Sequence, residues 1–173
     1  MFDANAVIED HQIVALLEAA RWAATWGNRQ PVRFVVGVRG DATYDRLAAL
    51  LKRGNAYAKA SSALVLVCAE EGEDERTALY ACVDAGAAIA QLTIEAVSRS
   101  LIAHPMAGFD VEGSRAAFGI PAEVRPIAMI AVGVLGDYEQ APPEIVERDS
   151  IPRARLPLAQ IVFTDTWGTP LTP

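Results

Sequence analysis

The residues best suited to bind a small molecule stand between a helix pattern and a strand pattern near the N-terminus. The connection Thr25–Gln30 contains Gly27, Asn28 and Gln30 and is followed directly by Pro31. A short polar loop on a rigid scaffold can hold its polar groups at the edge of a cleft. The alternative is an ordinary turn, because Gly-Asn and Gln-Pro pairs occur in many loops and can satisfy their own backbone.

Two arginines near the C-terminus have the chemistry to hold an anion. Arg153 and Arg155 are separated by one residue and follow the acidic stretch Glu139–Asp149. In an extended segment this spacing directs both side chains to the same side. A guanidinium presents planar, bidentate donors that suit an anionic group such as a phosphate. The alternative is a pair of solvated arginines, since arginine is mostly exposed in proteins.

The cysteines and histidines form no metal-binding or nucleophilic motif in the sequence. Cys68 and Cys82 lie in apolar segments, without CxxC spacing and without a cluster that includes His11 or His104. We therefore expect buried free thiols in a reducing compartment and no metal site. His104 could donate a proton, but the sequence offers it no partner, so a structural role is favoured and no catalytic residue is assigned.

The composition predicts one globular domain over residues 1–173. Apolar residues make up 52% and charged residues 21% of the chain, as in ordered globular proteins. The net charge of −7 argues against nucleic acid, whose phosphates select a basic surface. The N-terminus lacks the features of a secretory signal. The longest run without a charged residue, Pro126–Gly136, is far shorter than the ~20 residues of a membrane helix. We expect a cytoplasmic protein that does not enter a membrane.

Helical and strand patterns alternate along the chain, which indicates an α/β or α+β fold. Helical spacing of apolar residues predicts helices over Ile8–Trp22 and Tyr44–Arg53, and Asp110 begins a short helix that ends at Phe118. The mostly small and apolar segment Thr77–Ser100 predicts a long helix at the domain centre, at a subunit interface or at both. Tyr138–Arg153 is expected to be a surface excursion. The predicted strands are Val32–Val38, Ser62–Ala69, part of Leu101–Asp110, Ile127–Val134 and Leu158–Phe163.

Five stretches of the chain, each weak alone, together resemble the flavin-dependent nitroreductase family over nearly the whole length. They occur in the family's order and with ordinary spacing. The stretches are LLEAARWAATWGNRQPVRFVV (16–36), GNAYAKASSALVLVCA (54–69), DAGAAIAQLTIEAVSRSLIAHPMAGFD (84–110), FGIPAEVRPIAMIAVGVLGD (118–137) and PRARLPLAQIVF (152–163).

This resemblance implies an α+β fold with a central mixed or antiparallel sheet flanked by helices. It also implies an intertwined homodimer with FMN at the subunit interface, in which residues 138–173 cross to the partner. The implied activity is that of an FMN-dependent NAD(P)H oxidoreductase, with NAD(P)H as a transient donor. By a ping-pong scheme, hydride passes from NAD(P)H to the flavin and then to a nitroaromatic, quinone or similar small-molecule acceptor. In such an enzyme the flavin carries the chemistry, and the protein supplies binding and orientation.

The resemblance also assigns residues to the cofactor. Thr25 stands at the family's usual serine, and Asn55 stands where the family often places a flavin-contacting asparagine. The small residues Ala107 and Gly108 leave their backbone N–H groups open to a flavin edge. Trp26 and Gly27 would face the substrate. The implied cofactor-binding residues are Thr25, Asn28, Gln30, Asn55, Met106, Ala107, Gly108, Arg153 and Arg155.

The chain departs from the family at its start and in the loop. The family usually begins with an arginine- and serine-containing motif, of which only the closing aromatic, Phe2, is present. Either the start has been placed downstream of the true one or the segment is lost. Trp26 could line the substrate side of a flavin, or it could pack the loop onto the core. The alternative to an enzyme is a homologue that binds or sequesters flavin without turnover. An unrelated α/β domain is a third hypothesis, which a strict monomer would favour.

Overall fold

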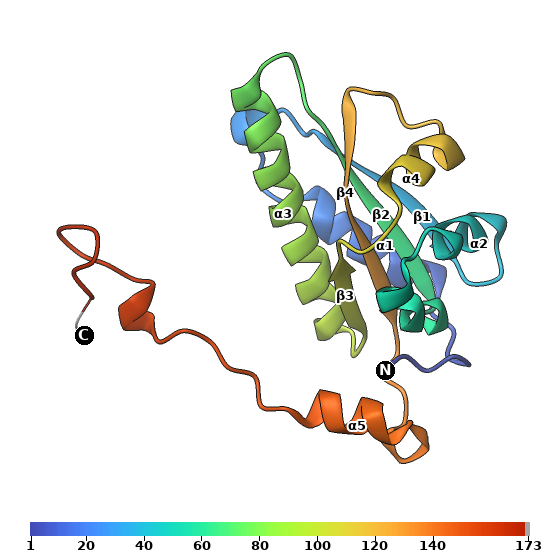
Figure 1. Cartoon of the computed structure of the whole chain (residues 1–173). Coiled ribbons are helices and arrows are strands. Elements are labelled where there is room, and N and C mark those ends of the chain that lie inside the picture. The colour runs from blue at the N-terminus through green and yellow to red at the C-terminus, as the bar shows by residue number, and fades with distance from the viewer. Residues whose placement is uncertain (172–173) are drawn as a thin grey trace. The chain divides into compact units, whose positions relative to one another are not determined.

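The centre of the fold is a sheet of four antiparallel strands in the order β1-β2-β4-β3, within residues 1–171, which the computed structural model describes (Figure 1). β2 pairs with β1 on one side and with β4 on the other, and its apolar side chains are buried on both faces of the sheet. The strands are β1 (Val32–Val38), β2 (Ala63–Glu70), β3 (Ile102–Met106) and β4 (Val124–Gly133).

Prolines lie in this sheet only where a missing N–H group costs little. Pro105 belongs to β3, the edge strand, which pairs with β4 alone. Pro126 lies in β4 where the register with β2 shifts between Val67 and Cys68. Edge strands and bulges are the positions where a sheet tolerates proline.

Helices cover both faces of the sheet. One face carries α1 (Asp10–Arg21) and the long α3 (Glu75–Ser98). The other carries α2 (Ala42–Ala49), the 3-10 helix η2 (Arg53–Ala60) and α4 (Val111–Phe118). The side chains of β2 alternate between the two cores. Val65 and Val67 pack toward α1 and α3, whereas Leu64 and Leu66 pack toward α2.

The long helix α3 has one buried face and one exposed apolar face. Asp74 caps its N-terminus by accepting the Thr77 backbone N–H. Its buried stripe consists mainly of alanines that allow close packing on the sheet and on α1. By length and composition alone α3 could cross a membrane, and 33% of the relevant window is buried inside the protein. The buried stripe packs in the core between α1, α3 and the sheet. The large exposed apolar side chains of α3 are Leu79, Val83, Ile94 and Val97.

The chain from Tyr138 onward forms a second unit, separate from Met1–Asp137. It contains the 3-10 helix η3 (Tyr138–Gln140), the helix α5 (Pro143–Ser150) and the 3-10 helix η4 (Leu158–Gln160). Within this unit the Tyr138 hydroxyl donates a 3.0 Å hydrogen bond to Asp149.

The predicted strand over Leu158–Phe163 is wrong. Its first residues form η4, where the Leu158 carbonyl accepts N–H groups from Ile161 and Val162. Phe163 makes one isolated bridge, with Pro170. An apolar run becomes a strand only when its backbone finds a partner strand, and in the described part of the chain this segment finds none.

The α+β class and the antiparallel sheet are confirmed. The first four predicted strands form, with boundaries that shift by a few residues. The second predicted helix ends at Ala49 rather than Arg53, because Leu51 forms a β-bridge with Phe109 and η2 begins at Arg53. The stretch Tyr138–Arg153, expected to be a surface excursion, includes α5, in which no residue is buried.

Candidate functional site

The anchor loop, Thr25–Gln30, adopts an unusual backbone conformation and contains hydrogen bonds between its own residues. Three of its residues have left-handed backbone angles, with φ of 58° at Gly27, 56° at Asn28 and 53° at Gln30. The Gln30 backbone N–H donates to the Thr25 hydroxyl at 3.3 Å, and the Gln30 side-chain amide donates to Asn28 Oδ1 at 3.0 Å. The side chains of Asn28 and Gln30 are exposed. The loop thus presents paired amides at the surface.

Trp26 ties this loop to α3. Its backbone N–H points at both carboxylate oxygens of Asp84, each 3.1 Å away. Its ring stacks on Tyr80, with centroids 4.9 Å apart and planes 20° from parallel. The guanidiniums of Arg29 and Arg76 lie 5.8 Å and 5.3 Å from the Trp26 ring centroid. These contacts favour the packing role for Trp26, and its contact with a substrate stays a prediction.

A cavity of about 140 Å³ lies beside the loop, between the end of α1, the start of β1 and the middle of α3. Thr25, Gln30, Arg33 and the buried Asp84 line its polar side, and alanines line much of the rest. Arg33 is engaged elsewhere, because it donates to two backbone carbonyls and pairs with Glu70 at 2.9 Å. The cavity is too small for a flavin ring system but can hold water or one small group.

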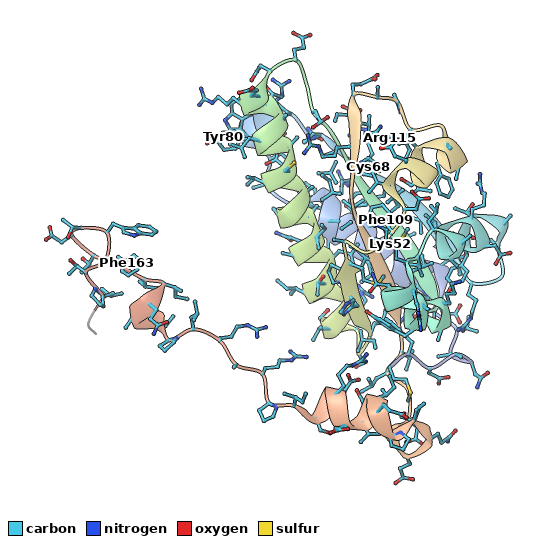
Figure 2. All side chains as sticks on the ribbon, in the orientation of Figure 1. Lys52, Cys68, Tyr80, Phe109, Arg115 and Phe163 are labelled. Carbon is cyan, nitrogen blue, oxygen red and sulfur yellow. The ribbon has the colours of Figure 1, made fainter. Side chains whose placement is uncertain are left out.

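A second set of predicted residues meets on the other face of the sheet. The side-chain amide of Asn55 donates to the Gly108 carbonyl at 3.0 Å, and the Lys52 backbone N–H donates to the same oxygen at 3.1 Å. Figure 2 shows Lys52 and Phe109 close together, whereas Tyr80 lies at the N-terminal end of α3. The structure thus joins Asn55 to the loop after β3.

The residues of that loop differ in exposure. Met106 is only 4% exposed and packs in the core on the side of the sheet covered by α2 and α4, so its side chain is not available to a ligand. A contact between Met106 and a cofactor would therefore come from its backbone. Ala107 is exposed and Gly108 is half-buried. These two remain the residues of the loop whose backbone a flat ligand can approach.

The predicted arginine pair lies in an irregular segment of the second unit. Arg153 and Arg155 are both exposed, between α5 and η4. Arg155 donates to the Ala154 carbonyl at 2.8 Å. Neither arginine forms an ion pair within residues 1–171. Both guanidiniums are therefore available to an anion.

The predicted site residues of the first unit fall into two groups on opposite faces of the sheet. The anchor loop follows α1 and contacts α3, which cover one face, whereas Asn55 and Met106–Gly108 belong to the side covered by α2 and α4. One copy of this unit does not bring the two groups together. A pocket that uses both groups needs a second copy of the chain.

The sequence did not identify Tyr80 and Asp84 as the residues that contact Trp26 of the anchor loop. Asp84 was visible only as a polar interruption in an apolar helix, and Tyr80 lies one helical turn before it. A lone carboxylate among alanines was the available signal. Its partner, the Trp26 backbone, lies 58 residues away in the sequence, so neighbouring residues could not reveal the contact.

The remaining titratable candidates do not add to this site. His104 lies edge-on to Tyr57, with ring centroids 5.8 Å apart. Cys68 is buried and Cys82 is half-buried, and both are free thiols. The expectation of free cysteines is confirmed, and that of full burial holds for Cys68 only.

Comparison with known proteins connects this arrangement to one family. A sequence profile described as the Nitroreductase family matches residues 1–134. The chain is 66% identical over 148 residues to an "Uncharacterized 15.4 kDa protein in ask 5'region" of Mycolicibacterium smegmatis, covering 81% of this chain and all of that protein.

Solved structures share the fold across almost the whole chain. An oxidoreductase containing FMN superposes with a TM-score of 0.88 at 28% identity, covering 97% of this chain and 87% of that one. A Desulfovibrio desulfuricans protein in complex with FMN gives a TM-score of 0.73 at 23% identity, covering 94% of this chain and 88% of that one. The second likeness shows the fold alone.

Proposed function

Because this chain belongs to the nitroreductase family, we propose that it is an FMN-dependent NAD(P)H oxidoreductase that reduces nitroaromatic, quinone or similar acceptors. The observation that carries this proposal is the match to an oxidoreductase containing FMN, at 28% identity over 97% of the chain. The family itself accounts for the oxidoreductase class and the fold. The donor, the acceptors and the ping-pong order are our proposal.

The donor groups of this chain fit FMN chemically. The exposed amides of Asn28 and Gln30 offer both hydrogen-bond donors and acceptors, as the polar edge of a flavin requires. The small residues Ala107 and Gly108 leave their backbone open to a ligand, on the side of the sheet covered by α2 and α4. The guanidiniums of Arg153 and Arg155, which form no ion pair within the described residues, suit a phosphate. These residues would hold and orient the cofactor, with Thr25 bracing the anchor loop from within and Gly27 left toward the substrate.

The chemistry needs few groups from the protein. FMN, when bound, supplies two-electron transfer between a nicotinamide and an acceptor. This chain's residues would fix the plane of the ring system and exclude competing ligands from its edge. Trp26, held against Tyr80, would limit the space beside the loop. No protein acid or base is required by this proposal.

We further propose that the active form is a homodimer. The two groups of site residues lie on opposite faces of the sheet, so one copy would contribute the anchor loop and the other Asn55 and Gly108. The exposed residues of α3 form a stripe at helical spacing, from Leu79 to Val97. At Gly86, within this stripe, an added Cβ would meet nothing within 4 Å in the same chain. A second copy packing there would bury the stripe and explain the small residue.

We place the protein in the cytoplasm, as its free cysteines suit a reducing compartment. The alternative, a flavin-binding protein without turnover, has the same FMN site and differs in its reaction with a nicotinamide. The two are therefore separated by kinetics rather than by binding.

Reconstitution with FMN tests the proposal. The full chain, purified and mixed with FMN, should retain a flavin spectrum after gel filtration and oxidise NADH or NADPH with a quinone acceptor. Parallel double-reciprocal plots would support the ping-pong order. A protein that cannot be reconstituted would overturn the proposal, and one that holds FMN without oxidising either nicotinamide would establish the sequestering alternative.

A further inference from the structure

Asp84 is a buried carboxylate with an unusual partner. It is 5% exposed, in the middle of α3. Both of its oxygens face one backbone N–H, that of Trp26, at 3.1 Å. Within residues 1–171 it forms no ion pair. Burial of a carboxylate with so few donors is costly, so a hydrophobic residue here would serve packing better. The position therefore calls for a role other than packing.

The anchor loop needs an external brace. Its left-handed residues include Asn28 and Gln30, and non-glycine residues occupy that region only when the surroundings hold them there. The hydrogen bonds inside the loop are two backbone bonds, from Asn28 N–H to the Thr25 carbonyl and from Arg29 N–H to the Trp26 carbonyl (3.2 Å each), one backbone-to-side-chain bond and one amide pair. The donors of all four bonds belong to the exposed residues Asn28, Arg29 and Gln30, so water can compete for them.

Asp84 and Tyr80 supply that brace from the rigid helix. The two residues are four apart in α3 and therefore lie on the same side of it. Asp84 holds the Trp26 backbone, and Tyr80 holds the Trp26 ring. A charge-assisted hydrogen bond in a buried site is the stronger of these two contacts. It also acts on the backbone of the residue directly before Gly27 and Asn28, where the chain turns left-handed.

We propose that Asp84 is the positioning residue of the anchor loop: its carboxylate fixes the Trp26 backbone and so presents Asn28 and Gln30 in the geometry that binds FMN. The consequence for FMN rests on the proposed function, whereas the bracing of the loop does not. Asp84 touches neither cofactor nor substrate in this role. Its effect passes through Trp26, so its loss should weaken FMN binding more than it weakens the fold.

Substitution with a matched rescue variant tests the proposal. Asp84→Ala removes the acceptor, Asp84→Asn keeps one acceptor oxygen at the same place, and Thr93→Val removes a different α3 hydrogen bond, the 2.8 Å bond to the Ile89 carbonyl. We expect Asp84→Ala to raise the FMN dissociation constant about tenfold, as loss of one charge-assisted hydrogen bond would. Asp84→Asn and Thr93→Val should stay within about threefold of wild type. Equal FMN affinity in wild type and Asp84→Ala, or no rescue by Asp84→Asn, would overturn the proposal.

Amide hydrogen exchange in the wild-type protein gives a readout that needs neither FMN nor a folded variant. The Trp26 amide should exchange much more slowly than the amides of Asn28, Arg29 and Gln30, because a buried carboxylate accepts it whereas theirs donate to acceptors within the loop itself, from exposed residues. Exchange of the Trp26 amide at the rate of these three would overturn the bracing role. If the wild type binds no FMN, the proposed function fails, but this exchange measurement still decides the role of Asp84.

Discussion

The side-chain amide of Asn55 donates a 3.0 Å hydrogen bond to the carbonyl oxygen of Gly108 and so connects η2 to the loop after β3. A side chain at position 108 would displace this amide. A Cβ there would lie 2.5 Å from Nδ2 of Asn55, well inside van der Waals contact. Asn55 and Gly108 therefore constrain each other, which the sequence could not reveal because they lie 53 residues apart.

Gly108→Ala should displace the Asn55 amide, break its hydrogen bond to residue 108 and lower the free energy of unfolding by about 0.5–1.5 kcal/mol, the usual net worth of such a bond. Thermal or urea unfolding of the purified protein measures this. The double variant Asn55→Ala/Gly108→Ala should lose less than the sum of the single variants, because removal of the amide relieves the clash. Gly54→Ala is the control, since a Cβ there meets nothing within 4 Å. Additive effects in the double variant would contradict the contact.

Arg153→Ala and Arg155→Ala should each weaken FMN binding about 10- to 100-fold if each arginine makes a charge-assisted bond to the phosphate. The two substitutions should have little effect on the binding of riboflavin, because riboflavin lacks the phosphate. Titration followed by quenching of flavin fluorescence measures both ligands. Arg148→Ala is the matched control in the same unit, because Arg148 already pairs with Asp149 at 3.0 Å. Equal losses for FMN and riboflavin would exclude a phosphate contact.

The sequence predicted those parts of the fold that depend on local pattern. The apolar run of β2 and the small-residue pattern of α3 each specify an element and its buried faces. The last predicted strand failed because a strand also needs a partner, and the run at Leu158–Phe163 has no paired strand within residues 1–171. Local pattern describes a segment's preference, whereas the partner is a tertiary property.

The contacts within the candidate site also depend on tertiary structure that local sequence pattern does not predict. The resemblance selected the anchor loop and Asn55, but the elements that hold them became visible only in three dimensions. Trp26 was predicted either to line the substrate side of a flavin or to pack the loop onto the core, and its stack on Tyr80 became visible only in the structure. The separation of the site residues onto two faces of the sheet is likewise a property of the topology, and no spacing in the sequence predicts it.

Cys68 should resist alkylation in the folded protein. Burial raises the pKa of its thiol from 9.0 to about 11, so the reactive thiolate is scarce at pH 8. In a Cys82→Ser background, iodoacetamide at pH 8 should label almost no protein until denaturant is added. The Cys68→Ser variant, which keeps the half-buried Cys82, shows how fast a more accessible thiol reacts. The pKa of the Cys68 thiol is higher in the folded protein than in the unfolded chain, so the neutral thiol contributes stability below pH 9. This contribution is lost as the pH rises toward 11. Rapid labelling of native Cys68 would contradict its burial.

A charge placed in the exposed stripe of α3 should break the proposed dimer. Val83 and Ile94 are 55% and 70% exposed in the single chain, so glutamate at either position costs the monomer little. If a second copy covers the stripe, the same change buries an unpaired carboxylate and should shift the protein to monomer. Sedimentation velocity at micromolar concentration measures this for Val83→Glu and Ile94→Glu.

The control for the dimer test is Val111→Glu, at the first position of α4, where an acid suits the helix N-terminus and no dimer contact is proposed. It should leave the oligomeric state unchanged. The monomeric variants should also lose FMN, because one copy carries the anchor loop and Asn55 on opposite faces of its sheet. A monomer that binds FMN as tightly as the wild type would refute the shared site, and a wild-type protein that is already monomeric would refute the dimer.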